Sequence, residues 1–153
     1  MPGIISLVAS GDSYSADNST LDNRHIRIGK RTMSTSISSA FKIDKPFAER
    51  KAESAEIREK YPHHIPVICE QAPRTTRLPE LAKRKFLVPE SITVSQLYCI
   101  LRTRLGIDST TSIYLNCNGV FLSGTSCLGR IDSECRDIDG FLYISYTGQE
   151  TFG

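Results

Sequence analysis

The sequence predicts an α+β fold in which a mixed sheet surrounds one helix and two further helices precede the sheet. Three observations predict this class. From Ile65 onward, the predicted segments follow in the order strand, strand, helix, strand, short strand, helix, strand. A tight-hairpin signal, Asn118-Gly119, separates two of the apolar runs. A densely charged helical pattern stands before the first strand.

Residues 1–40 are rich in Ser, Thr, Asp and Asn, and their apolar residues form only short, isolated pairs. Such a segment buries too little apolar surface to offset the entropy lost on ordering. We therefore expect a disordered N-terminal extension over residues 1–40 and one folded domain over residues 41–153. Met33 is a candidate alternative start just before this domain.

Two helices are predicted at the start of the domain. The stretch F-K-I-D-K suggests a short helix, and Pro46 behind it suits the first turn of another. Alanine, Phe47 and Ile57 are spaced among dense charges, which predicts a surface helix over residues 46–60. Acidic and basic residues four positions apart support this helix locally.

Two apolar runs, I-P-V-I-C-E at residues 65–70 and K-F-L-V-P at residues 85–89, predict strands. A proline at the end of the second run favours an edge position in the sheet. Thr93-Val-Ser-Gln96 matches a capping box, which opens a helix that Gly106 ends.

The remaining elements complete the sheet. The runs I-Y-L-N-C and V-F-L form the hairpin, a less regular helix covers residues 125–135, and F-L-Y-I-S-Y is the last strand. Gly129 weakens the helical signal. This order is that of a ubiquitin-like β-grasp. The final residues 147–153, T-G-Q-E-T-F-G, have no evident partner strand, and we expect them to form a flexible tail.

Composition excludes several kinds of function. A net charge of +2 is too small to require a nucleic-acid partner, and no apolar run reaches the length of a membrane span. The five cysteines are odd in number and show no metal-ligand spacing, so we predict reduced thiols in a cytoplasmic protein without metal or cofactor. Residues 41–89 hold eleven Lys/Arg against seven Asp/Glu, which favours a basic face for acidic ligands.

Five stretches, F-A-E-R-K-A-E-S, H-I-P-V-I-C-E, K-R-K-F-L-V-P, D-G-F-L-Y and E-T-F-G, follow one another along the chain. With them the sequence resembles, over about residues 41–153, the autophagy-related ubiquitin-like modifiers of the GABA-receptor-associated-protein and microtubule-associated light-chain family. The resemblance implies a substrate of conjugation and not an enzyme. It also implies attachment of Gly153 to phosphatidylethanolamine during autophagosome formation.

The implied partners are activating and conjugating enzymes that carry Gly153 as a thioester, a deconjugating cysteine protease, and a phosphatidylethanolamine membrane. Tubulin is a further candidate. The protein would be cytoplasmic, and on the autophagosome membrane once lipidated. Because glycine lacks a Cβ, its carbonyl can enter narrow active sites. Since the chain ends at Gly153, we expect that it needs no proteolytic trimming.

The resemblance further implies binding of receptor or adaptor proteins through aromatic-x-x-aliphatic motifs, often with acidic residues in front. An edge strand at residues 85–88 offers backbone groups to which such a peptide can add as a further strand. Lys85 and Arg104 would hold the acidic flank. The family pattern forms the aromatic pocket from Glu53, Ile57, Pro66, Ile68, Lys85, Leu87 and Phe141, and the aliphatic pocket from Phe86, Val88, Pro89, Ile92, Leu97 and Ile100.

Other interpretations stay open at this point. Ile68, Ile92 and Ile100 suit an ordinary core as well as a pocket. The chain could be a ubiquitin-like adaptor that is never conjugated, or a cysteine hydrolase that uses one of its thiols with His63 or His64. Gly153 could also be joined to a protein lysine, although the two leading helices and K-A-E-S favour the lipid.

Overall fold

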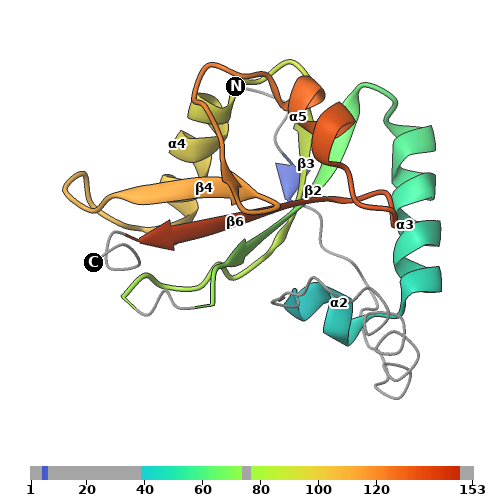
Figure 1. Cartoon of the computed structure of the whole chain (residues 1–153), viewed down its shortest axis with the longest axis horizontal. Coiled ribbons are helices and arrows are strands. Elements are labelled where there is room, and N and C mark those ends of the chain that lie inside the picture. The colour runs from blue at the N-terminus through green and yellow to red at the C-terminus, as the bar shows by residue number, and fades with distance from the viewer. Residues whose placement is uncertain (1–4, 7–38, 74–76, 149–153) are drawn as a thin grey trace.

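The computed structural model describes residues 5–6, 39–73 and 77–148, and these residues confirm the α+β class (Figure 1). The strands form one mixed sheet in the order β1-β3-β2-β6-β4-β5. The strands are β1 Ile5–Ser6, β2 His64–Gln71, β3 Lys85–Pro89, β4 Ile113–Cys117, β5 Val120–Phe121 and β6 Leu142–Gly148. The helices are α2 Ala40–Asp44, α3 Phe47–Lys60, α4 Val94–Leu105 and α5 Leu128–Cys135.

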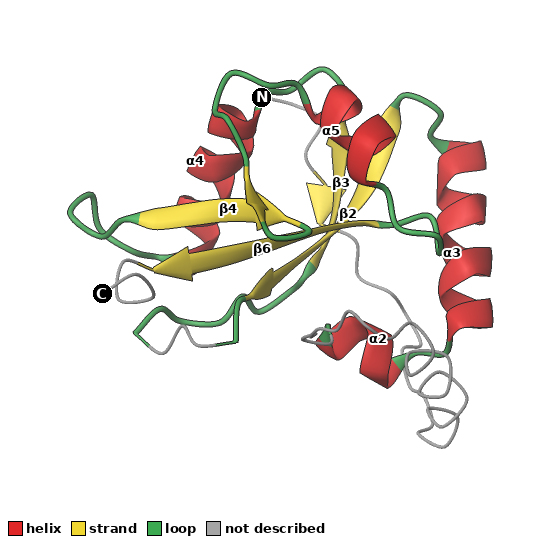
Figure 2. Ribbon diagram, in the orientation of Figure 1, coloured by secondary structure: helices red, strands yellow, loops and turns green. Residues whose placement is uncertain are grey.

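Strand β2 lies at the centre of the grasp. It pairs antiparallel with β3 and parallel with β6, and β6 in turn pairs antiparallel with β4. Figure 2 shows α4 on one side of this sheet and α2 and α3 on the other. Alternate residues of β2 serve the two sides, since Val67 and Cys69 belong to the main core with α4 whereas Ile68 belongs to a smaller cluster with Phe41 of α2.

Local sequence signals set three element boundaries as predicted. In the capping box of α4, Thr93 Oγ1 accepts from the Gln96 amide at 3.2 Å and Gln96 Oε1 accepts from the Thr93 amide at 2.9 Å. Gly106 ends α4 in the left-handed region, at φ 69°. Asn118 and Gly119 have φ values of 54° and 83°, which a type I′ hairpin turn requires.

Helix α5 begins at Leu128, three residues after the predicted start at residue 125. Gly129 has a packing role there, because its amide donates to the Glu90 carbonyl at 2.9 Å. A Cβ at this position would lie 3.2 Å from that same oxygen. The glycine that weakened the helical signal therefore permits close contact between α5 and the segment after β3.

The prediction of a flexible tail over residues 147–153 is wrong for its first two residues. Strand β6 continues to Gly148, with Thr147 opposite Tyr114 and Gly148 opposite Ile113. The sequence pattern had ended the strand at Tyr146, but β4 is long enough to supply partners for two more residues. The rest of the predicted tail, including Gly153, lies outside the described residues.

The predicted disordered extension over residues 1–40 also contains described structure. Strand β1 pairs antiparallel with β3, with Ile5 opposite Leu87 and Ser6 opposite Phe86. Ser39 caps α2, because its Oγ accepts from the amides of Phe41 and Lys42 at 3.1 and 3.3 Å. The prediction of disorder therefore fails at these positions. Strand β3, predicted at the sheet edge, has β1 outside it.

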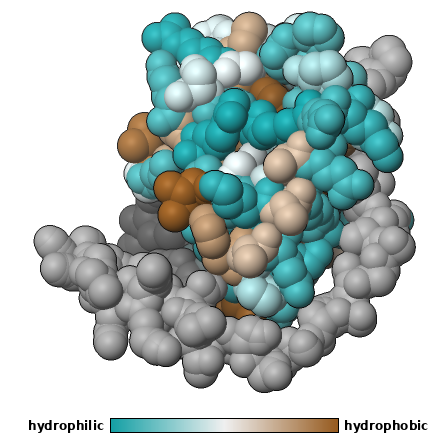
Figure 3. All heavy atoms as spheres, turned by 90° about the vertical axis from the view of Figure 1, so that its right-hand side faces the viewer, coloured by the Kyte–Doolittle hydropathy of each residue, from teal (hydrophilic) through white to brown (hydrophobic). Residues whose placement is uncertain are grey.

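Helix α3 docks on the domain through polar groups. Its buried residues are Arg50 and Ser54, while the surface on this side of the molecule is mainly hydrophilic (Figure 3). Arg50 Nε donates to Asp139 Oδ2 at 2.8 Å, and Ser54 Oγ donates to the Asp139 carbonyl at 2.5 Å. The Asp139 carboxylate also accepts from the Tyr143 hydroxyl at 2.6 Å and the Phe141 amide at 2.9 Å.

This network predicts a large loss of stability on breaking the Arg50–Asp139 pair. Arg50→Met leaves a fully buried carboxylate without its cation and should lower the free energy of unfolding by about 3–5 kcal/mol, measured by urea denaturation. The control Arg130→Met removes the exposed pair with Glu134 and should change it by about 0.5 kcal/mol or less. Equal effects of the two substitutions would contradict this assignment.

Candidate functional site

The residues of the predicted aromatic pocket come together between α3 and the strands β2 and β3. The β2–β3 register places Ile68 opposite Lys85 and Pro66 opposite Leu87, so these four side chains share one face of the sheet. Ile68 and Phe141 are fully buried in the smaller cluster, with Ile57 of α3 packed against it.

Phe41 is a further residue of this region that the sequence did not assign to it. Its ring packs edge-on against Phe141 at a centroid distance of 5.3 Å, and it is almost fully buried. Helix α2 positions it, because the Phe41 amide binds both Ser39 Oγ and Glu70 Oε2. The only available signal was an aromatic residue at the start of the structured region, which does not specify a contact 100 residues away.

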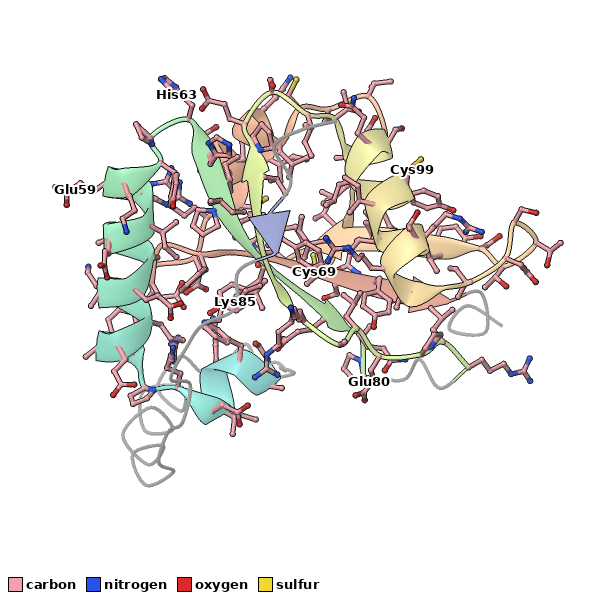
Figure 4. The ribbon with its side chains drawn as sticks, turned by 180° about the vertical axis from the view of Figure 1, so that it is seen from behind. Glu59, His63, Cys69, Glu80, Lys85 and Cys99 are labelled. Carbon is pink, nitrogen blue, oxygen red and sulfur yellow. The ribbon has the colours of Figure 1, made fainter. Side chains whose placement is uncertain are left out.

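Charged groups line this region as a three-residue cluster. Glu53 of α3 accepts from Lys45 Nζ through Oε1 and from Lys85 Nζ through Oε2, each at 2.8 Å. Burial opposes the charge of Glu53, but the hydrogen bonds and charges of the two lysines outweigh burial and lower its pKa. Figure 4 shows Lys85 at the start of β3, near α2 and α3.

Two residues of the predicted aliphatic pocket, Phe86 and Val88, lie on the opposite face of β3, toward α4, whereas strand alternation places Pro89 on the face of Lys85 and Leu87. Phe86, Val88, Ile92 and Leu97 are buried members of the main core. Ile100 is partly buried against that core, and Pro89 is partly exposed. Among the six residues of this predicted pocket, Pro89 and Ile100 are the two with partly exposed side chains.

The two cations predicted for the acidic flank differ in their surroundings. Lys85 is buried and already paired with Glu53. Arg104 of α4 is exposed, and its guanidinium lies 5.5 Å from the centre of the Phe86 ring. Within the described part of the chain Arg104 forms no ion pair, so it can meet an incoming carboxylate without breaking one.

The cysteines do not form a catalytic arrangement. Burial raises the pKa of Cys69, and burial together with the neighbouring Cys135 raises the pKa of Cys117 to about 12. Figure 4 shows Cys99 on the outside of α4, with His63 well away from both labelled cysteines. In residues 39–73 and 77–148, no group of Cys, His, Asp or Glu is arranged to hold a metal ion.

A mixed β-grasp sheet with two helices before its first long strand defines a ubiquitin-like protein. The model of the family "Autophagy protein Atg8 ubiquitin like" matches residues 49–153. The chain belongs to this Atg8 family, whose members are ubiquitin-like modifiers and not enzymes.

Individual relatives agree with this assignment. The chain is 44% identical over 115 residues to autophagy-related protein 8 of Mycosarcoma maydis, which covers 75% of this chain and 97% of that protein. It is 40% identical over 115 residues to autophagy-related protein 8e of Arabidopsis thaliana, covering 75% and 93%. A crystal structure of Trypanosoma brucei ATG8 matches with a TM-score of 0.70 and 33% identity, covering 74% of this chain and 97% of that one.

The Glu53 cluster predicts a pH-dependent contribution to stability. Because the folded state lowers the Glu53 pKa below its usual 4.5, the stabilisation is present above that value and is lost as the pH falls through the folded-state pKa. Glu53→Gln should therefore destabilise the protein at pH 7 by about 1 kcal/mol, and the difference should shrink toward pH 3.

Urea denaturation at both pH values measures this difference. Glu59→Gln is the matched control, because Glu59 lies on the exposed side of the same helix (Figure 4). It should have little effect at either pH. If Glu53→Gln changes the free energy of unfolding equally at pH 7 and pH 3, the stabilisation by this cluster does not come from the charge of Glu53.

Proposed function

We propose that this chain is a modifier that is joined through Gly153 to phosphatidylethanolamine and recruits cargo receptors to the autophagosome membrane. The observation that carries the proposal is the family match, which extends from residue 49 through Gly153. The motif E-T-F-G at the end of that match supports it. Among the described residues no helix is long and apolar enough to span a bilayer.

The attachment chemistry uses the carboxylate of Gly153. An activating enzyme converts it with ATP to an acyl adenylate and releases pyrophosphate, and that enzyme's thiol then displaces AMP to give a thioester. A thiol of the conjugating enzyme attacks this thioester and takes over the acyl group, and the first thiol is released. The amine of phosphatidylethanolamine attacks this carbonyl, so an amide forms and the conjugating enzyme's thiol leaves. Gly153 has no Cβ to hinder these attacks. A deconjugating cysteine protease would hydrolyse the amide bond between Gly153 and the lipid.

The receptor peptide binds along β3 in this proposal. Its backbone pairs with the side of β3 that faces away from β2, which strand augmentation requires. Its aromatic side chain enters the region between α3 and β3, beside Leu87 and the Glu53 cluster. Its aliphatic side chain lies over Pro89 and Ile100, and its acidic residues approach Arg104.

Leu87→Ala should weaken binding of a synthetic peptide that carries two glutamates and then Trp-x-x-Leu by roughly 1–3 kcal/mol, because Leu87 lines the aromatic pocket. Isothermal titration measures the affinity, and circular dichroism checks the fold. Val120→Ala, on the exposed strand β5, is the control and should bind normally.

Since Leu87 is fully buried, Arg104→Gln supplies a second test at an exposed position. It should weaken binding and reduce the dependence of the affinity on salt, because one charge contact is lost. Unchanged affinity in both folded variants would rule out this site.

Deleting Gly153 should abolish lipid attachment, because the reacting carboxylate is then that of Phe152. The measurement is the mass of the chain after incubation with matching activating and conjugating enzymes, ATP and phosphatidylethanolamine liposomes. The chain ending in Gly153 should gain one lipid mass. Peptide affinity should be equal in both forms. A Gly153 chain that gains no mass would favour an unconjugated adaptor.

A further inference from the structure

Strand β1 lies where a receptor peptide would have to bind. β2 takes one side of β3 over residues from Lys85 to Pro89. The other side of β3 pairs with β1, at Phe86 and Leu87. Figure 1 shows β1 beside β3, on the side away from β2. In the described sheet, removal of β1 would leave β3 as the outermost strand.

A strand has only two sides with backbone hydrogen-bonding groups, so two additional strands cannot pair with the same residues on one side. A receptor peptide that adds to β3 at Phe86 and Leu87 therefore excludes β1. The proposed receptor site and the β1 site are the same backbone edge.

We propose that the chain's own N-terminal strand occupies the receptor-binding edge of β3, and that a receptor peptide binds by displacing it. The inference rests on the proposed receptor function. The occupant is identified by the pairing itself, with Ile5 opposite Leu87 and Ser6 opposite Phe86.

The pairing of β1 with β3 is weak enough for a peptide to displace β1. Two paired residues form a short strand, whose intrinsic affinity is low. Residues 7–38 tether it to α2, and a tethered segment acts at an effective concentration on the order of millimolar when the linker can span the sites. The pairing of β1 with β3 is then populated in the absence of a competitor, and a peptide that binds more tightly displaces β1.

The two competitors differ in charge. Residues 1–10, M-P-G-I-I-S-L-V-A-S, contain no acidic or basic side chain, so β1 brings no partner for Arg104. A receptor peptide with an acidic flank gains this contact in addition to the backbone pairing. Added salt weakens the charge contact and leaves the pairing of β1 largely unchanged, so displacement should become less favourable as salt rises.

The test uses the full-length chain with Ile5→Pro and Ser6→Pro together. Proline has no amide hydrogen and a fixed φ, so it cannot support this pairing. The control is Ser19→Pro, which adds a proline to the same extension outside β1. The probe is the synthetic peptide with two glutamates followed by Trp-x-x-Leu.

The double variant should bind the probe about three- to tenfold more tightly than the unmodified chain, since the competing state is removed. Ser19→Pro should bind like the unmodified chain. Without peptide, hydrogen exchange of at least one of the Phe86 and Leu87 amides should be faster in the double variant. Equal or weaker affinity of the double variant, or unchanged exchange at both amides, would overturn the inference.

The exchange measurement separates this inference from the proposed function. If the probe binds none of the chains, receptor binding at β3 is wrong. Exchange at Phe86 and Leu87 still reports whether β1 covers the edge, with faster exchange in the double variant supporting the occupancy and unchanged exchange refuting it.

Discussion

The buried ion pair between Arg50 and Asp139 is the contact on which the arrangement of this domain depends. Both residues are almost completely removed from solvent, and the Asp139 carboxylate is also bound by the Tyr143 hydroxyl and the Phe141 amide. Charges at this depth are tolerated only when their hydrogen-bonding capacity is used. The same contact holds α3 against the segment that precedes β6, and it places Glu53 within hydrogen-bonding distance of Lys85.

The proposed peptide site depends on this docking. On one face of β3, Lys85 and Leu87 lie toward α3, and on the other face Phe86 and Val88 enter the main core under α4. Strand β3 therefore borders two apolar regions of different composition, which is what the proposed binding of a motif with two spaced anchors needs. β1 pairs with the outer backbone edge of β3, to which the peptide would add in this proposal.

Sequence patterns predicted the elements whose signals are local. The capping box before α4, the Asn118-Gly119 turn and the apolar runs of β2 and β3 each lie within a few residues, and each was confirmed. The family resemblance supplied the pocket residues. The Arg50–Asp139 pair joins positions 89 residues apart, and in sequence both look like ordinary surface charges. Likewise, the pairing of β1 and of the last two residues of β6 depends on partner strands far away in the sequence, which no local pattern reveals.

The affinity of the acidic Trp-x-x-Leu peptide for the Asp139→Asn variant is the most direct test of whether this buried pair sets the geometry of the proposed peptide site. Asp139 has no solvent exposure, so it cannot touch the peptide. The titration is made at a temperature where circular dichroism shows the variant to be folded. We expect a several-fold loss of affinity, because α3 and the Glu53 cluster are no longer held in place. An affinity equal to that of the unmodified chain would contradict this expectation.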